Sequence, residues 1–552
     1  MRILFITHSF NSLTQRLYME LTQREHEVSV EFDINDDVTR EAVELYKPDL
    51  IVAPFLKRAV PDDIWKNHVC LIVHPGPKGD RGPSSLDWAV QEGAPEWGVT
   101  VLQAAEEMDA GDIWATHNFS MRGAAKGSLY RNEVTLAAVK GVLEAVENFG
   151  KPGFKPTPLD DMSGWRDLLR QPERAIDWAR DDTATVLRKI RAADGFPGVR
   201  DNVLGLDCFL FDAHLEENLK GDPGDVIAQW NGAICRATVD GAVWITHLKE
   251  KIEGERTFKL PAAMSLKDRL DGVPERNGSW RDIWYERDGD IGYLHFPFYN
   301  GAMSTDQCCR LAQAVRQTRT DDARVLVLMG GHDFWSNGIH LNTIEAAESP
   351  ADESWANINA MDDLCREILT LEDKLTVAAM QGNAGAGGVF LALCADVVVA
   401  RQGIVMNPHY KNMGNLFGSE YWTYVLPRRG GDAAASVMTN RLPVGTDEAM
   451  GKGLVDTVLP GLPEEFAQGV RQYVQSLAGS SSLEDEIAGK KERRARDEAE
   501  KPLAFYRAEE LEKMKLNFYG FDPSYHVARY NFVFRIPHSR TPLHLAKHRR
   551  LL

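Results

Sequence analysis

The chain has 552 residues, of which 43% are hydrophobic and 26% charged. This is ordinary globular composition, and at roughly 100–200 residues per domain the length predicts three or four domains. The 63 Lys and Arg residues are outnumbered by 81 Asp and Glu residues, which gives a formal net charge of -18. Because affinity for phosphate backbones comes mainly from clustered cations, this balance argues against a general nucleic-acid-binding protein.

Cysteine usage and hydropathy favour a cytoplasmic protein. The seven cysteines include no CxxC pair and no evenly spaced framework, which predicts reduced thiols and no bound metal. Only a short apolar run, Ile3–Ile6, follows the first two residues, so no signal peptide is expected. The most apolar stretch, 375–400, contains Gln381, Asp396 and four glycines. We expect it to form a strand, a glycine-rich turn and a buried helix rather than a membrane span.

Short apolar runs alternate with amphipathic stretches over the first 150 residues. Strands are expected at Ile3–Ile6, Val28–Phe32, Leu50–Ala53 and Val69–Val73, and a helix over Leu13–Glu25. Alternation of strands and helices favours an open parallel sheet, so the chain is predicted to begin with a Rossmann-like α/β domain over 1–155. Residues 151–158 are rich in Pro and Gly and are expected to form a linker.

A second domain is predicted over 160–262. It opens with a helix at Thr183–Arg191, and short alternating runs such as Ala233–Val239 and Val243–Leu248 follow. Such runs favour a small antiparallel barrel.

A third α/β domain is predicted over 283–480, with strands at Gly292–Phe296 and Val325–Met329. A charged helical extension over 481–552 follows it. The basic tail from His538 to Arg550 is expected to be solvated, and the alternative is that it binds cofactor phosphates.

A histidine follows the fourth expected strand. His74 ends that run and is followed by a glycine-rich loop. In an open parallel sheet, ligands bind beyond the carboxyl ends of the strands, so His74 is expected at such a site. Taken alone, the residue is more simply a histidine that caps a loop.

Two further motifs change that interpretation. Together with Arg81-Gly82 and 108–113 (Met-Asp-Ala-Gly-Asp-Ile), the His74 segment resembles the folate-dependent formyltransferases over about residues 1–260. The resemblance implies 10-formyltetrahydrofolate as co-substrate and a catalytic pair of His74 and Asp109. It also implies an OB-like barrel for the second domain, because residues 190–198 match that family's barrel motif. The folate-binding residues that it implies are Ala53, Phe55, Leu56 and Arg81.

One position departs from that family. Ile72 replaces the catalytic asparagine and offers no hydrogen bond to the formyl oxygen. Losing one such donor typically costs about 10²–10³ in rate. Either another group compensates or the acceptor is more reactive than an amine, and a thiol acceptor fits the second case.

The third domain carries a second set of motifs. Residues 333–341, 381–396 and 451–456 together resemble the crotonase (enoyl-CoA hydratase/isomerase) superfamily over about 283–460. The resemblance implies a coenzyme A thioester substrate and an oxyanion hole formed by the amides of Ile339 and Gly387. Asn300 matches a turn asparagine of the family and is expected to be structural, with coenzyme A binding or support as the alternative.

The hydratase carboxylates are absent, because Phe390 and His409 stand at their positions. Adding water to a double bond needs two acid–base groups, so hydratase activity is not expected. Tyr410 and Glu420 are a candidate acid–base pair, with His409 as a possible supporting residue. The alternative, weighed equally, is that Ser419 caps a helix and Glu420 lies in its first turn.

The succession of the two halves resembles the NiFe-hydrogenase maturation family HypX, also called HoxX. That resemblance implies formyl transfer to coenzyme A, decarbonylation of formyl-CoA to carbon monoxide, and hydrogenase maturation proteins as partners, without nucleic acid or membrane. Two alternatives stay open. One is a formyltransferase for another acceptor, whose non-catalytic crotonase-like half serves in dimerisation or coenzyme A binding. The other is a non-catalytic scaffold that binds coenzyme A and a hydrogenase maturation partner.

Overall fold

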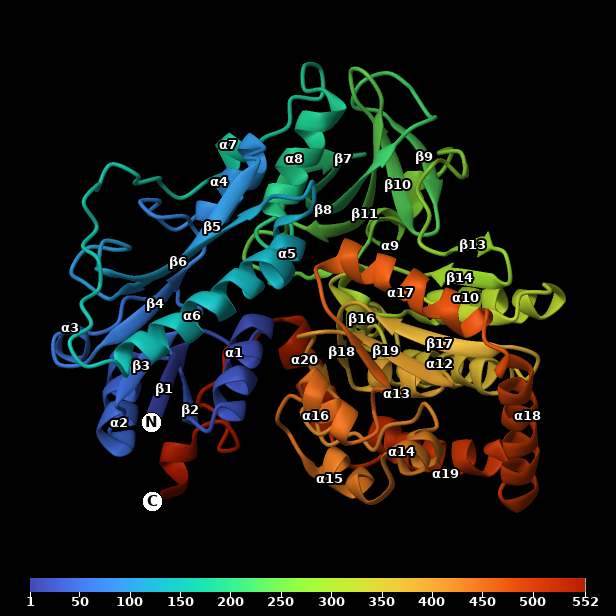
Figure 1. Ribbon diagram of the computed structural model, residues 1–552. Coiled ribbons are helices and arrows are strands. Elements are labelled where there is room, and N and C mark those ends of the chain that lie inside the picture. Colours follow the sequence, from blue (N-terminus) through green and yellow to red (C-terminus); the bar gives the residue numbers. More distant parts are fainter. Residues whose placement is uncertain (552) are drawn as a thin grey trace. The chain divides into compact units, whose positions relative to one another are not determined.

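The computed structural model describes residues 1–551 and divides into two compact units (Figure 1). Unit 1 comprises Met1–Trp280 together with the C-terminal segment from Pro537, and unit 2 comprises Arg281–Ile536. Within residues 1–551, no helix combines the length and the apolar character that crossing a membrane requires. All seven cysteines are free.

Unit 1 begins with a six-stranded sheet in the order β2-β1-β3-β4-β5-β6. Its strands are β1 (Arg2–Thr7), β2 (Glu27–Phe32), β3 (Leu50–Ala53), β4 (Cys70–His74), β5 (Glu96–Gln103) and β6 (Ile113–Ser120). Its helices are α1 (Ser12–Gln23), α2 (Asp36–Tyr46), α3 (Asp62–Trp65), α4 (Ser85–Glu92), α5 (Lys126–Leu129) and α6 (Thr135–Phe149). Helix α6 packs against β5, β6 and α1, whereas α2 and α3 cover the opposite face.

The four expected strands are confirmed, and β1 to β4 are parallel to one another. The sheet continues beyond these four strands with two that were not expected, and β5 pairs antiparallel with both β4 and β6. The short loop 104–112 joins β5 to β6, and a connection of that length produces antiparallel neighbours. This loop carries Asp109 back to the end of β4.

A second, antiparallel sheet follows in unit 1, in the order β7-β8-β11-β10-β9, with β12 paired to β11. Its strands are β7 (Val199–Val203), β8 (Leu206–Glu216), β9 (Val226–Trp230), β10 (Ala233–Ala237), β11 (Ala242–Glu250) and β12 (Lys259–Pro261). The accompanying helices are α7 (Gln171–Arg174), α8 (Thr183–Ala193) and α9 (Ala262–Leu266). The pairings form an open path, so closure into a barrel stays a prediction.

Unit 2 contains a six-stranded sheet, β13-β14-β15-β17-β19-β21, and a three-stranded parallel sheet, β16-β18-β20. The strands are β13 (Trp284–Asp288), β14 (Ile291–His295), β15 (Val325–Leu328), β16 (Phe334–Ser336), β17 (Leu375–Met380), β18 (Asn383–Gly385), β19 (Val397–Arg401), β20 (Met406–Asn407) and β21 (Thr457–Leu459). The helices are α10 (Thr305–Gln317), α11 (Leu341–Ala346), α12 (Pro350–Leu369), α13 (Gly387–Leu393), α14 (Trp422–Gly430), α15 (Ala434–Thr439), α16 (Thr446–Gly451), α17 (Pro463–Ala478), α18 (Leu483–Glu500), α19 (Leu503–Tyr519) and α20 (Ser524–Val533).

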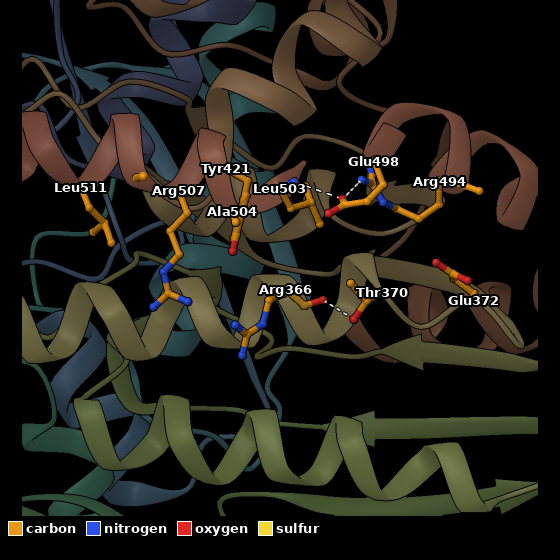
Figure 2. A pocket seen from close by; sticks show the side chains of 12 residues that line it. Arg366, Thr370, Glu372, Tyr421, Arg494, Glu498, Leu503, Ala504, Arg507 and Leu511 are labelled. Atoms are coloured by element: carbon orange, nitrogen blue, oxygen red, sulfur yellow. Dashed lines mark hydrogen bonds and ion pairs between the residues drawn. The ribbon is translucent and has the colours of Figure 1, made fainter. Parts of the chain in front are cut away.

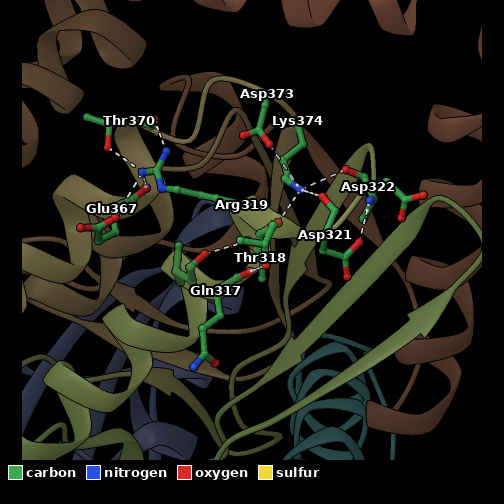
Figure 3. Close-up of polar contacts among 12 residues, drawn as sticks. Gln317, Thr318, Arg319, Asp321, Asp322, Glu367, Thr370, Asp373 and Lys374 are labelled. Atoms are coloured by element: carbon green, nitrogen blue, oxygen red, sulfur yellow. Dashed lines mark hydrogen bonds and ion pairs between the residues drawn. The ribbon is translucent and has the colours of Figure 1, made fainter.

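The larger sheet of unit 2 is buried on both faces. Residues of α17 and α18 cover one face, and α10, α12 and α13 cover the other. A buried lysine ties α10 to β17 (Figure 3). Lys374 is fully buried, and its Nζ donates to the carbonyls of Thr318, Asp321 and Ala323 at 2.7, 2.8 and 3.1 Å. An ammonium group has three donors, and each of them meets a backbone carbonyl here, so Lys374 links the segment after α10 to the start of β17.

The C-terminal segment packs on the first sheet of unit 1, so the expectation of a solvated tail is wrong. His548 is fully buried, and its ring nitrogens lie 2.8 Å from Ser29 Oγ and 2.8 Å from Glu31 Oε2. Arg549 also contacts Glu31 at 2.8 Å. Burial raises the pKa of Glu31, but hydrogen bonds from His548, Thr541 and Arg549 outweigh it and hold the pKa below its usual value. The buried carboxylate of β2 therefore fixes the tail.

Replacing this histidine tests that role. His548→Ala should lower the free energy of unfolding of unit 1 by about 2–3 kcal/mol, because a buried carboxylate loses one of its donors. Hydrogen exchange of the β1 and β2 amides measures the change. Arg540→Ala is the matched control, because its guanidinium is 58% exposed and pairs at the rim with Glu41, and exposed pairs contribute about 0–1 kcal/mol. Equal effects of the two substitutions would contradict the assignment.

Candidate active sites

His74 lies at the carboxyl end of β4 with both ring nitrogens facing carboxylates. Its Nε2 is 2.9 Å from Asp80 Oδ2, and its Nδ1 is 3.4 Å from Asp109 Oδ2. The three side chains are 4%, 6% and 10% exposed. The structure thus brings His74 and Asp109 together as expected and adds Asp80, a residue of the glycine-rich loop after His74 that the sequence motifs did not indicate.

The loop after His74 is held by three side chains, one from α4 and two from β5. The Pro75 carbonyl accepts hydrogen bonds from Ser85 Oγ at 2.8 Å and Trp97 Nε1 at 2.9 Å, and the Gly76 carbonyl accepts from Thr100 Oγ1 at 2.9 Å. A Cβ at Gly76 would lie 2.2 Å from Asp80 Oδ2 and 2.4 Å from His74 Nε2. Only glycine therefore permits this approach of histidine and aspartate.

Asp109 is fixed by the same loop. It has a left-handed backbone, with φ of 54°, and its Oδ2 accepts a hydrogen bond from the Gly82 amide at 3.1 Å. Arg81 donates to the Met108 carbonyl from Nε at 3.1 Å, and it also binds the Met162 carbonyl at 3.2 Å. Arg81 thus holds the segment that carries Asp109, and its assignment to folate stays a prediction.

The other residues assigned to folate lie at the end of β3, the parallel neighbour of β4. Ala53 pairs in register with Ile72. The ring of Phe55 packs edge-on against His8 and Tyr130, at centroid distances of 5.9 and 6.3 Å. Leu56 packs against the cluster beneath α2 and α3. These residues and His74 therefore share one edge of the sheet.

The residues expected to form the oxyanion hole of unit 2 lie on two adjacent segments. A Cβ at Gly338 would lie 3.4 Å from the Gly387 nitrogen, so the backbone before Ile339 runs next to the first residue of α13. A Cβ at Gly387 would lie 2.0 Å from Glu420 Oε1. The carboxylate of Glu420 therefore lies directly against this glycine.

Tyr410 and Glu420 form a buried pair. They are 5% and 1% exposed, and the Tyr410 hydroxyl lies 2.5 Å from Glu420 Oε2. Phe390 stacks on the Tyr410 ring at a centroid distance of 5.4 Å and an interplanar angle of 19°. The competing expectation of a side-chain helix cap is wrong: α14 begins at Trp422 with Tyr421 at the N-cap, and the Ser419 hydroxyl donates to Asp362 instead of accepting from an amide of α14.

Two further buried carboxylates, Asp362 of α12 and Glu510 of α19, hold this segment. The amide of Glu420 donates to Asp362 Oδ1 at 2.8 Å, and the amide of Tyr421 donates to Glu510 Oε2 at 3.0 Å. Ser419 Oγ lies 2.8 Å from Asp362 and 3.3 Å from Glu510. No local sequence motif marked either carboxylate, since they lie far along the chain from Glu420.

The three carboxyl groups share an environment that disfavours charge. Burial and the negative charge of Asp362 raise the pKa of Glu420 to about 8, despite the hydrogen bond from Tyr410. Burial also raises the pKa of Glu510 to about 8 and that of Asp362 to about 6. The pKa of Tyr410 is raised by burial and by Glu420. Glu420 is thus suited to exchanging a proton near neutral pH.

The two remaining candidates of unit 2 are Asn300, which is exposed, and His409, which is buried. Asn300 is exposed, has a left-handed backbone with φ of 55°, and its carbonyl accepts a hydrogen bond from Asn337 Nδ2 at 2.8 Å. Asn tolerates that conformation better than most residues, so a turn role fits. His409 is 5% exposed and precedes Tyr410.

A cavity of about 570 Å³ opens between α12, α18 and α19 (Figure 2). Arg366, Arg494 and Arg507 line it together with Tyr421. None of Ile339, Gly387, Tyr410 and Glu420 lines it. This cavity is therefore distinct from the Tyr410–Glu420 pair, although Tyr421 joins the two regions along the chain.

The raised pKa of Glu420 predicts a pH dependence of stability. In the unfolded chain a glutamate ionises near 4.5, whereas in the folded chain Glu420 holds its proton up to about 8. The folded state then binds more protons between these values, so stability should fall as pH rises from about 4.5 to 8. Glu420→Gln should reduce the fall in melting temperature across this range, with the exposed Glu512→Gln as control. An unchanged slope in Glu420→Gln would contradict the raised pKa.

Family models match successive parts of the chain: formyl transferase over 25–146, formyl transferase C-terminal domain over 168–260, and enoyl-CoA hydratase/isomerase over 293–514. The methionyl-tRNA formyltransferase of Ralstonia nicotianae is 27% identical over 43% of this chain and 72% of its own length. Both halves of the expected architecture are thereby confirmed.

Two relatives match the whole length. The hydrogenase maturation factor HoxX of Bradyrhizobium diazoefficiens is 56% identical and covers 100% of this chain and 97% of its own. The crystal structure of HypX from Aquifex aeolicus in complex with tetrahydrofolic acid has 54% identity and a TM-score of 0.97, covering 100% of this chain and 99% of that chain. The chain therefore belongs to the HoxX/HypX family of hydrogenase maturation factors.

Proposed function

We propose that this protein converts the formyl group of 10-formyltetrahydrofolate into carbon monoxide for the iron of a NiFe hydrogenase, in the cytoplasm, in two steps. In the first step the formyl group moves from folate N10 to the thiol of coenzyme A. The carbon–nitrogen bond breaks, a carbon–sulfur bond forms, and the thiol proton passes to N10. His74 and Asp109 relay that proton. Tetrahydrofolic acid in the complex of the Aquifex aeolicus relative supports folate as the donor.

In the second step formyl-CoA loses carbon monoxide at the Tyr410–Glu420 pair. Glu420 removes the proton from the formyl carbon, the carbon–sulfur bond breaks with its electron pair on sulfur, and carbon monoxide leaves. Tyr410 protonates the sulfur and regains a proton from Glu420, so no net proton and no water are consumed. The amides of Ile339 and Gly387 bind the thioester oxygen.

One observation carries this second step: the buried Tyr410–Glu420 hydrogen bond lies directly against Gly387. A hydratase would need two carboxylates around a water molecule, and here Phe390 stands at one of their positions and packs on Tyr410. With the pKa of Glu420 raised to about 8, part of the carboxyl is ionised near neutral pH, and this ionised fraction is a stronger base than an ordinary glutamate. The alternative of a non-catalytic crotonase-like half leaves this pair without a purpose.

The two steps are separable by mutation. Purified protein given 10-formyltetrahydrofolate and coenzyme A should release carbon monoxide, measured by haem absorbance, and should release none without coenzyme A. His74→Ala should reduce formyl-CoA formation by about 10²–10⁴-fold, the usual contribution of an acid–base group. Glu420→Gln should still form formyl-CoA but lose carbon monoxide release by a similar factor.

Glu512→Gln, an exposed charge-neutralising substitution in unit 2, is the control for Glu420→Gln. Formyl transfer to another acceptor without coenzyme A would favour the rival formyltransferase. Undiminished hydrogenase maturation in His74→Ala would favour the non-catalytic scaffold. Undiminished carbon monoxide release in Glu420→Gln would remove Glu420 from the second step.

A further inference from the structure

We propose that Asp80 is a positioning residue that fixes the ring of His74, so that Nε2 carries a proton directed at Asp80 and Nδ1 is the nitrogen that exchanges protons during formyl transfer. This inference rests on the proposed first step, because it assigns the proton transfer to one atom of His74.

The distances distinguish the two nitrogens of His74. The separation of 2.9 Å between Nε2 and Asp80 Oδ2 is that of an ordinary N–H···O hydrogen bond. The separation of 3.4 Å between Nδ1 and Asp109 Oδ2 is longer than such bonds usually are. A neutral imidazole has one N–H donor, and the closer carboxylate fixes it on Nε2.

The surrounding loop is built for this contact. Gly76 leaves the space in which the Asp80 carboxylate meets Nε2, since its missing Cβ would overlap both groups. The Asp80 amide donates to the Pro77 carbonyl at 3.0 Å, which closes the turn that directs the carboxylate back to His74. The side chains of Ser85, Trp97 and Thr100 hold the turn's backbone. Because α4 and β5 hold the backbone of this loop, the Asp80 carboxylate is preorganised to meet His74.

On the other side of the His74 ring, Nδ1 has no short hydrogen bond to Asp109. Asp109 already accepts the Gly82 amide at 3.1 Å, so its carboxylate is held independently of His74. The Nδ1 atom therefore lies beside a fixed carboxylate without being engaged by a short hydrogen bond. A base whose second nitrogen is oriented by a buried carboxylate is the arrangement by which histidine is made to exchange protons at one defined atom.

Asp80→Asn and Asp80→Ala test the assignment, with Glu106→Gln as a control that neutralises an exposed carboxylate on the neighbouring loop. For formyl transfer to coenzyme A, we expect kcat to fall about 10²-fold in both Asp80 variants, within the range for a disturbed acid–base group. The KM for 10-formyltetrahydrofolate should change less than threefold, and Glu106→Gln should behave as wild type.

Nitrogen-15 NMR of histidine-labelled protein reports which ring nitrogen of His74 carries the proton. A purely structural role of Asp80 would leave that tautomer unchanged. The His74 ring of the wild-type protein should carry its proton on Nε2, and Asp80→Ala should lose that preference while melting within a few degrees of wild type. A wild-type ring protonated on Nδ1, or an unchanged kcat in Asp80→Asn, would overturn the proposal. If wild-type protein transferred no formyl group, the proposed function would fail, yet the spectrum would still decide the orientation of His74.

Discussion

Two consecutive residues with left-handed backbone, Glu420 and Tyr421, have φ of 61° and 57°, and the arrangement of the unit 2 site depends on what holds them there. Non-glycine residues in this region cost on the order of 1–3 kcal/mol each. The strain persists because Asp362 accepts the Glu420 amide and Glu510 accepts the Tyr421 amide. Two carboxylates, from α12 and from α19, thus place the Glu420 side chain against Gly387, and the C-terminal helices of unit 2 are part of the site.

In both sites a glycine without a Cβ leaves room for a buried carboxylate to reach the group beside it. Gly76 admits Asp80 to His74, and Gly387 admits Glu420 to the backbone expected to bind the thioester. A buried carboxylate is costly unless hydrogen bonds satisfy it. In unit 1 backbone and imidazole donors surround Asp80 and Asp109, whereas in unit 2 the carboxyls lie together and the pKa of Glu420 rises to about 8. The first arrangement suits a fixed relay and the second a group that gains and loses a proton.

Much of this could be predicted from the sequence, because strands and motif residues are local signals. The apolar runs that end at Ala53 and His74 predicted strands β3 and β4. The motif segment from Tyr410 to Glu420 predicted two side chains that do form a hydrogen bond. Asp362 and Glu510 could not be found in this way, since their partners lie 58 and 89 residues away. The prediction for the C-terminal tail was wrong for the same reason. Its basic composition suggested solvation, but His548 contacts Glu31, which lies 517 residues earlier in the chain.

Phe390 shows why losing a hydratase carboxylate is compatible with a new reaction at the same place. Its ring stacks on Tyr410 and so fixes the plane of the phenol whose hydroxyl meets Glu420. Hydration needs a polar position that holds water, whereas decarbonylation needs only a proton moved from carbon to sulfur in a dry site. In the proposed decarbonylation, a phenyl ring in place of a carboxylate would leave no polar group to hold water and would orient the Tyr410 ring on which it stacks. The single position that argues most strongly against a hydratase therefore contributes to the chemistry proposed in its place.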